Sequence, residues 1–207
     1  MNAFSDLSLA HNGVSVLENE HASHAFKLLI HGDHHFLHNV KPSKFAELRK
    51  KIVQAVLHTD MTSHFATVAK IKSNAAGKPW GELDSDMQWE TLMYMLHMAD
   101  ISNPAKGDPM FKLWTDRCLE EFFAQGDKEK EMGLVVSMLC DRNTTKRPDS
   151  QIGFINFVVK PAYEVLAGVI PAVGENVLPV IESNIVYWKK EKDLEVIVED
   201  SDAEENV

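Results

Sequence analysis

Residues 89–104, WETLMYMLHMADISNP, decide the fold class of this 207-residue chain. Apolar side chains recur in the stretch at helical spacing, at Trp89, Leu92, Met93 and Leu96. Pro104 disfavours helical backbone angles at Asn103, so the helix has to end before that residue. The stretch therefore predicts an amphipathic helix that ends in a turn carrying the side chains of Asp100 and Asn103.

Three other segments have the same apolar spacing and predict further helices, each with one buried stripe. The stripes are Phe45, Leu48, Ile52 and Val56; Phe111, Trp114, Cys118 and Phe122; and Val177, Ile181, Ile185 and Trp188. Gly126 is predicted to end the helix that begins near Phe111, and Pro161 and Pro171 to interrupt the last third of the chain. Because period-two alternation is almost absent, we predict an all-α, multi-helix fold.

The formal net charge is −10, and the acidic excess is concentrated between Glu191 and Glu205. Proteins that bind a nucleic-acid backbone or an anionic membrane surface need clustered lysine and arginine, so we predict neither partner. Helical periodicity is lost after Lys192. Residues 191–207 are therefore predicted to be a disordered acidic tail, although residues 195–198 have the composition of a short strand.

The cysteine pattern indicates a reducing compartment. Cys118 and Cys140 match neither a zinc-site spacing nor a disulfide framework for a chain of this length. The sequence has no signal-peptide pattern and no apolar run that approaches the length of a membrane span. We expect a soluble protein and predict that it is located in the cytoplasm.

The turn at residues 97–104 does not establish a site by itself, because Asp and Asn before proline are ordinary turn formers. It is followed in order by WTDR at residues 114–117 and EEFFAQGDKE at residues 120–129. Further motifs are SVLEN at 15–19, TDM at 59–61 and SQIGFI at 150–155. Together they resemble the signature of class I cyclic nucleotide phosphodiesterases over residues 12 to 190.

The resemblance implies a helical, HD-domain-like hydrolase, with residues 1–190 as part of its catalytic domain. It implies two divalent metal ions, zinc plus magnesium or manganese, that assist hydrolysis of cAMP or cGMP to the 5′-monophosphate in cyclic nucleotide signalling. Asp100 matches a metal ligand of the family, and Glu18 and Thr59 match residues that hold metal-bound water. Outside the motifs, Glu18 would be interpreted as a surface carboxylate and Thr59 as a helix-end hydroxyl.

The resemblance also implies a purine site. Gln151 and Phe154 lie three residues apart, on one face of a helix, where an amide can bond a base edge and a ring can stack on its face. Cys118 and Phe122 match the facing wall of the base slot, and Asn103 matches a polar residue beside it. The alternative is that Phe154 is a core residue and Gln151 is solvated. Adenine and guanine both remain possible because the amide can rotate, although Asn103 favours cAMP by the family pattern.

The early histidines offer a competing metal site. Their spacing is compatible with imidazoles on one helix face, at His31, His34, His35 and His38. We interpret them as a solvated face, since they match variable surface positions of the family and Gly32 interrupts the run. His21, His24 and His64 are candidates for the neighbourhood of the site without an assigned role.

Two family motifs, His-Asn-x-x-His and His-Asp-x-x-His-Pro-Gly, do not occur in the 207 residues. Asn2-Ala3-Phe4 resembles the segment that follows the second motif, so we expect an N-terminally truncated domain without its general-acid histidine. We predict that this chain alone is inactive. The alternative function is that of a fragment or pseudoenzyme that binds nucleotide or other partners, with an upstream regulatory domain or self-association as the expected interactions.

Overall fold

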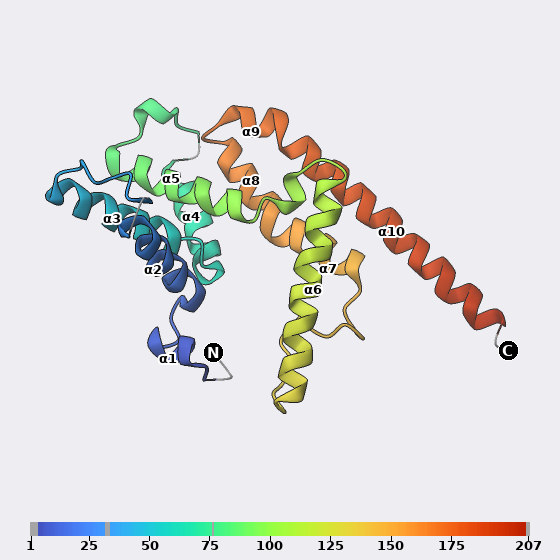
Figure 1. The fold of residues 1–207 in the computed structure, drawn as a ribbon. Helices are drawn as coiled ribbons and strands as arrows, with labels where there is room; N and C mark the ends of the chain where they lie inside the picture. The colour runs from blue at the N-terminus through green and yellow to red at the C-terminus, as the bar shows by residue number, and fades with distance from the viewer. Residues whose placement is uncertain (1–3, 32–33, 76, 206–207) are drawn as a thin grey trace. The chain divides into compact units, whose positions relative to one another are not determined.

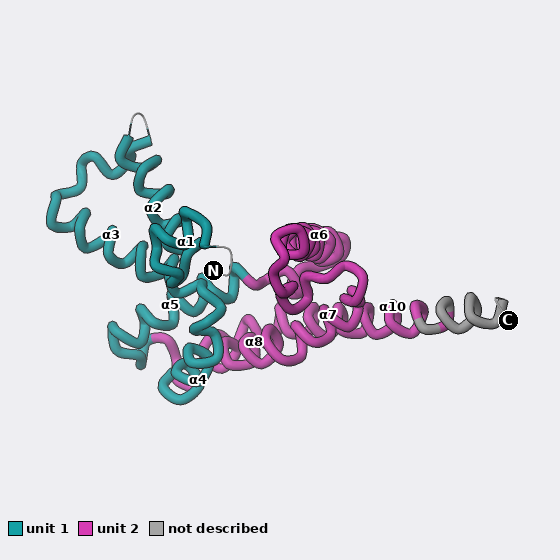
Figure 2. The backbone as a smooth tube through the Cα atoms, turned by 90° about the horizontal axis from the view of Figure 1, so that it is seen from below, with its two compact units in different colours: residues 1–75, 81–100 teal, residues 76–80, 101–207 magenta. Residues whose placement is uncertain are grey.

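The computed structural model describes residues 4–31, 34–75 and 77–205. These residues fold into two compact units, residues 1–75 with 81–100 and residues 76–80 with 101–207, which Figure 2 draws in teal and magenta. Asn2 and Ala3, on which the expected start of the domain depends, lie outside the described residues. The described part of the chain contains helices and no strands, which confirms the predicted all-α class.

Unit 1 contains the first five α-helices of the chain and the 3-10 turn η2 (Figure 1). They are α1 (Asp6–Ala10), α2 (Val16–Ile30), α3 (Pro42–Leu57), η2 (Met61–Ser63), α4 (His64–Asn74) and α5 (Ser85–Asp100). Helix α2 packs against α3, and α3 and α4 both pack against α5. Ile71, Tyr94 and Met98 are fully or almost fully buried, so α5 supplies much of the core of this unit.

Unit 2 is organised around its last helix (Figure 1). Its elements are η4 (Asn103–Ala105), α6 (Met110–Glu131), α7 (Arg147–Phe154), η5 (Ile155–Val159), α8 (Lys160–Ala167), α9 (Pro171–Asn176) and α10 (Leu178–Glu205). Helix α10 contacts η4, α7, α8 and α9. Asn184 on α10 donates to the carbonyl oxygens of Pro104 and Lys106, at 2.9 Å each, and so fixes the turn that follows the Asp100 motif. The remaining 3-10 turn, η3 (Trp80–Glu82), lies where the chain passes between the units.

The helical backbone continues from α7 into α8 through Pro161, where the sequence predicted an interruption. The connecting element η5 is a π-helix, with Ile155 and Val159 fully buried. Proline has no N–H to bond the carbonyl group four residues earlier, and a π-turn placed just before it lets the helix pass the missing bond. Pro171, in contrast, begins the new helix α9 as predicted.

Gly126 does not end its helix, because α6 runs on to Glu131. The residue is buried, and a Cβ atom at this position would lie 2.7 Å from the carbonyl carbon of Cys140 and would overlap its carbonyl oxygen. A glycine is needed here for close backbone approach, so the prediction of a helix end was wrong.

The predicted buried stripe of α10 is confirmed at Ile181, Ile185 and Trp188. On α5 the prediction is wrong in part, since Leu92 and Leu96 are exposed. This helix carries apolar side chains on two faces, and periodicity alone does not identify the face that meets the core.

The stripe predicted for α6 is also wrong in part. Phe111 is buried, but Trp114, Cys118 and Phe122 are exposed. The buried face continues instead through Thr115 and Leu119. Because Thr115 is polar, a pattern of apolar residues alone does not identify this buried face.

Helix α10 extends through residues 191–205, for which the sequence predicted a disordered tail with a possible strand. Glu, Lys and Leu have high helix propensity, so a polar segment can continue a helix that is already anchored by packing. The division of the chain at residue 190 stays a prediction. Across the described ranges, no helix combines the length and the apolar character that crossing a bilayer requires.

Candidate functional site

Unit 1 holds the three residues that the sequence assigned to the metal site. Asp100 is the last residue of α5 and is exposed. Glu18 lies in the first turn of α2, and Thr59 follows the end of α3. The Thr59 hydroxyl donates to the Val56 carbonyl oxygen at 2.8 Å, which closes the last turn of that helix.

A hydrogen bond connects the element that carries Glu18 to the turn that carries Thr59. The Ser15 hydroxyl, at the N-cap of α2, donates to a carboxylate oxygen of Asp60 at 2.7 Å. The other carboxylate oxygen of Asp60 accepts from the Thr62 amide at 2.8 Å and caps η2. Burial raises the pKa of Asp60, but these hydrogen bonds outweigh it and leave the pKa below its ordinary value.

A buried histidine pair connects the same turn to the helix of Asp100. His64 Nδ1 and His97 Nε2 lie 2.8 Å apart, and both residues are 1% exposed. His97 Nδ1 is buried without a hydrogen bond of regular geometry, although the Thr59 backbone carbonyl is close enough to act on the ring. Burial, followed by the charges of His64 and His58, lowers the pKa of His97 and favours a neutral imidazole.

Sequence reasoning placed His64 near the site but gave it no role, and it gave His97 none. The signal was available, because His97 and Asp100 are three residues apart and therefore neighbours on one helix surface. In the structure the pair holds α4 and α5 together behind Asp100.

Within the described residues, no group of three His, Cys, Asp or Glu side chains could hold a metal ion. Asp100 offers one exposed carboxylate, and His64 and His97 are occupied with each other. These residues do not by themselves fit a two-metal centre, which needs several donors around each ion.

The predicted histidine face is not helical, because α2 ends at Ile30. His31, His34 and His38 are exposed, and His38 Nδ1 approaches the His35 carbonyl oxygen at 2.8 Å. Their interpretation as surface residues agrees with this exposure; Gly32 lies outside the described residues. His21 and His24 are exposed as well, and His24 contacts Glu20 at 3.3 Å.

Unit 2 holds the residues assigned to the purine. Gln151 on α7 is buried, at 7% exposure, and its Oε1 atom accepts from the Thr115 hydroxyl of α6 at 3.2 Å. Arg147 and Asp116 pair at 3.0 Å one turn away, so α6 and α7 are joined at two points. A buried amide held by one hydrogen bond has a defined orientation, and its N–H groups remain as donors.

Asn103 and Cys118 lie near one another. Burial, then the charge of Glu121, raises the pKa of the Cys118 thiol, and a hydrogen bond with Asn103 partly offsets this. Asn103 Oδ1 is buried and accepts no regular hydrogen bond from the described residues, so it is an open acceptor. Both cysteines are free thiols, as predicted from their spacing.

The two phenylalanines of the predicted base slot lie on different helices. Phe154 ends α7 and is partly buried, whereas Phe122 on α6 is 41% exposed. In the part of the chain that the structure describes, they make no ring contact with each other. Their assignment to a base slot stays a prediction.

This combination of helices and polar groups matches a known class of hydrolase. The model of the 3′5′-cyclic nucleotide phosphodiesterase family matches residues 1–180, and the chain belongs to this family. It is 36% identical over 195 residues to a probable 3′,5′-cyclic-AMP phosphodiesterase, pde-4, of Caenorhabditis elegans, and 36% identical over 196 residues to the 3′,5′-cyclic-AMP phosphodiesterase 4C of Mus musculus.

Each alignment covers 91% of this chain but only 29% and 28% of the two relatives. The phosphodiesterase domain of the rhodopsin phosphodiesterase of Salpingoeca rosetta has a similar fold, with a TM-score of 0.87 and 30% sequence identity. That comparison covers 97% of this chain and 61% of the solved one. The chain thus spans less than two thirds of the proteins that it matches.

Proposed function

We propose that this chain forms the nucleotide-binding part, and the Asp100-bearing part, of a phosphodiesterase that hydrolyses 3′,5′-cyclic nucleotides to 5′-monophosphates. The observation that carries the proposal is the buried hydrogen bond between Thr115 and Gln151. A glutamine that is buried and tied by a single acceptor bond has unused donors, and such donors suit the hydrogen-bonding edge of a purine.

The proposed base site combines this amide with Phe154, three residues further on. Residues at this spacing lie on one helix surface, so the ring and the amide can meet one ligand. Stacking of a base on an aromatic ring contributes about 1–3 kcal/mol.

We propose cAMP as the preferred substrate. With Oε1 engaged by Thr115, the amide N–H of Gln151 can donate to a ring nitrogen of adenine, and the second lone pair of Oε1 can accept from the adenine amine. The open acceptor of Asn103 suits an amine as well. The relatives named above are described as cyclic-AMP phosphodiesterases, which supports this choice.

The two divalent ions proposed for the intact domain, zinc plus magnesium or manganese, supply activated water and polarise the phosphodiester when bound. Asp100 is our proposed ligand from this chain, with Glu18 and Thr59 as proposed partners of metal-bound water. The Ser15–Asp60 bond and the His64–His97 pair support this proposal because they fix the elements that carry all three residues.

A second candidate function is that of an inactive module that binds nucleotide or a protein partner. It is favoured by one observation, the lack of any three-donor cluster in the described part of the chain. An upstream regulatory domain, self-association and a cytoplasmic location remain predictions of both candidates.

The proposed activity can be tested in a chimera that joins this chain to the preceding part of the catalytic domain of the nematode relative. We expect the chimera to hydrolyse cAMP, and Asp100→Ala to abolish turnover and lower the bound metal measured by mass spectrometry. The matched control changes His34 and His38 to alanine, which should leave both quantities unchanged. A folded chimera, verified by circular dichroism, that binds cAMP but does not turn it over would favour the second candidate.

A further inference from the structure

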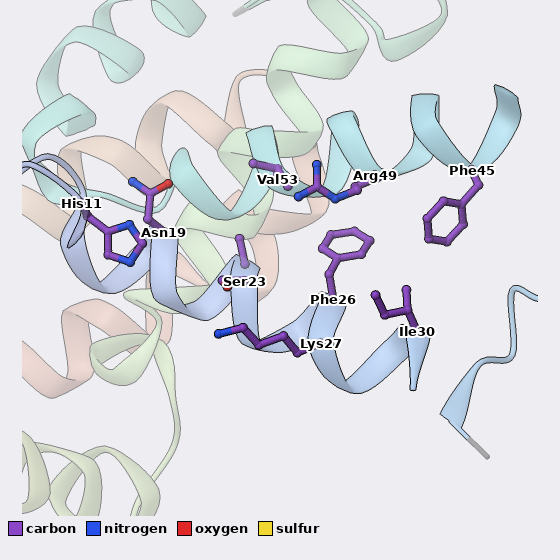
Figure 3. Close-up of a pocket in the computed structure, with 10 residues that line it drawn as sticks. His11, Asn19, Ser23, Phe26, Lys27, Ile30, Phe45, Arg49 and Val53 are labelled. Carbon is purple, nitrogen blue, oxygen red and sulfur yellow. The ribbon is translucent and has the colours of Figure 1, made fainter. Parts of the chain in front are cut away.

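Unit 1 contains a pocket of about 410 Å³ between α2 and α3, shown in Figure 3. Its lining includes His11, Ser23, Phe26, Lys27, Phe45 and Arg49, and none of these residues belongs to the sites assigned above. The volume lies within the range of small-molecule sites. The pocket therefore has the size of a ligand site and is separate from the residues proposed for hydrolysis.

Helical spacing builds both walls of the pocket. On α3 the lining residues are Phe45, Arg49 and Val53, which repeat every four residues and form one row. On α2, Ser23 and Lys27 form one such row, and Phe26 and Ile30 form a second. In Figure 3, the side chains of Phe26 and Ile30 from α2 point toward α3, whereas the Lys27 side chain runs along α2.

Arg49 is the unexpected member of its row, because it lies between two apolar residues. Its guanidinium carbon lies 5.1 Å from the centroid of the Phe26 ring, which orients the group over an aromatic face. Among the described residues it forms no ion pair with a carboxylate, whereas Lys44 on the same helix pairs with Glu47 at 3.0 Å. Arg49 is exposed, and a guanidinium without a carboxylate partner is available to bind an anion.

Two further groups complete the polar part of the pocket. Lys27 and Ser23 line the opposite wall, and neither makes a hydrogen bond or ion pair with another described residue. The nearby carboxylate of Glu20 already contacts His11 at 3.4 Å and His24 at 3.3 Å. Two exposed cations and a hydroxyl donor therefore line the pocket, and the nearby carboxylate of Glu20 contacts the lining residue His11 and interacts with the charge of Lys27.

The other end of the pocket is apolar. Phe26 and Phe45 meet edge to face with centroids 6.3 Å apart, and Ile30 lies beside them. In Figure 3, Phe45 and Ile30 lie at the end away from His11, with Phe26 and Arg49 between. Apolar groups thus form the end of the cavity away from His11, and Arg49 lies over Phe26 in its middle part.

We propose that this pocket binds an anionic amphiphile, a molecule with one phosphate or carboxylate head and an apolar chain. The head binds Arg49, Lys27 and Ser23, and the chain lies against Phe26, Ile30 and Phe45. Arg49 has a competing role as a purely structural residue whose methylene stem covers Phe26. The two roles differ in one respect, since only a binding role depends on the charge of a ligand head group.

The test titrates decyl phosphate, below its micelle concentration, into the purified 207-residue chain in an isothermal calorimeter. We expect saturable binding near one molecule per chain. Decyltrimethylammonium, which has the same tail and the opposite charge, and inorganic phosphate, which has no tail, should each bind at least about ten-fold more weakly, because each loses one half of the recognition. Equal binding of the cationic and anionic amphiphiles would refute the proposal, as would the lack of saturable binding.

The variant Arg49→Gln should weaken binding of decyl phosphate about ten-fold or more, the scale of a lost hydrogen bond to a charged group. Lys50→Gln is the matched control, because Lys50 is an exposed cation like the neighbouring Arg49 but does not line the pocket. Lys27→Gln replaces Arg49→Gln if the latter does not fold by circular dichroism. Equal weakening by the pocket variant and by Lys50→Gln would mean general charge attraction and would overturn the site.

The source of the amphiphile is distinguished by co-sedimentation with phosphatidylcholine vesicles that contain phosphatidic acid. Binding to these vesicles that Arg49→Gln abolishes would assign the site to a bilayer lipid. Binding of decyl phosphate without binding to vesicles would assign it to a free amphiphile. Either result supports the pocket, whereas failure of both ligands to bind rejects it.

Discussion

Substitution of Gly126 by alanine should lower the stability of the protein, although the same change usually stabilises a helix. In an exposed helix interior, alanine is more stable than glycine by about 1 kcal/mol. At Gly126 the new Cβ atom would lie 2.7 Å from the Cys140 carbonyl carbon, and closer still to its oxygen. Both are backbone atoms, so no side-chain rotation relieves the overlap.

The magnitude follows from two opposing terms. Overpacking of a close contact costs about 1–3 kcal/mol, and displacement of backbone belongs to the upper part of this range. Against a helix-propensity gain of about 1 kcal/mol, the net loss is about 1–2 kcal/mol. For a chain of this length, that corresponds to a fall of about 2–8 °C in the melting temperature.

Gly153 provides the matched control. It also lies in a helix, α7, but an added Cβ atom there would have no neighbour within 4 Å. Differential scanning calorimetry of the two variants should give a lower melting temperature for Gly126→Ala and an unchanged or higher one for Gly153→Ala. An increase for both variants would show that the segment after α6 can move away without cost, and that close backbone approach does not require glycine at residue 126.

Three other predictions address the site. In the active chimera, Phe154→Ala should weaken cAMP binding by about 1–3 kcal/mol, and Phe157→Ala, a control at a 76% exposed ring, should not; equal effects on the Michaelis constant would contradict the base-site assignment. The lowered pKa of Asp60 stabilises the fold above the unfolded pKa of about 3.9, and this contribution is lost as the pH falls through the folded value. Urea unfolding should therefore show Asp60→Asn to be less stable than the parent chain at pH 7, with a difference that shrinks below about pH 4; a constant difference would exclude the proposed hydrogen-bonded carboxylate. The 207-residue chain alone should not hydrolyse cAMP or cGMP with added zinc, magnesium or manganese, and turnover that disappears in Asp100→Ala would reverse this expectation.

The motifs assigned roles to residues whose contacts the local sequence does not predict. Gln151 was assigned a role through its motif, but Thr115, the residue that donates a hydrogen bond to it, lies 36 positions away in the sequence. The same holds for the bond from Ser15 to Asp60, which spans 45 positions. Sequence patterns report neighbours along one helix, and they contain no direct information about which helices meet.

The fold class was predicted correctly, while the buried faces of individual helices were not. In α10 one apolar face exists, so periodicity identified Ile181 and Trp188. In α5 and α6 the apolar residues surround more of the helix, and exposed Leu92 and Trp114 were taken for core. Gly126 was misinterpreted for a related reason. A glycine is needed there because the backbone of Cys140 approaches closely, and not because the helix ends.

The π-helix at Ile155–Val159 makes the relative orientation of the helix faces before and after it depend on the number of residues in the segment. Its wider turn accommodates one residue more than an α-turn, and each residue of an α-helix rotates the chain by about 100°. Deletion of one residue from this segment would therefore turn the face of Gln151 by about that angle relative to the buried face of α8, which includes Tyr163 and Leu166. Substitutions that keep the length should preserve this orientation, whereas a change in residue number should not.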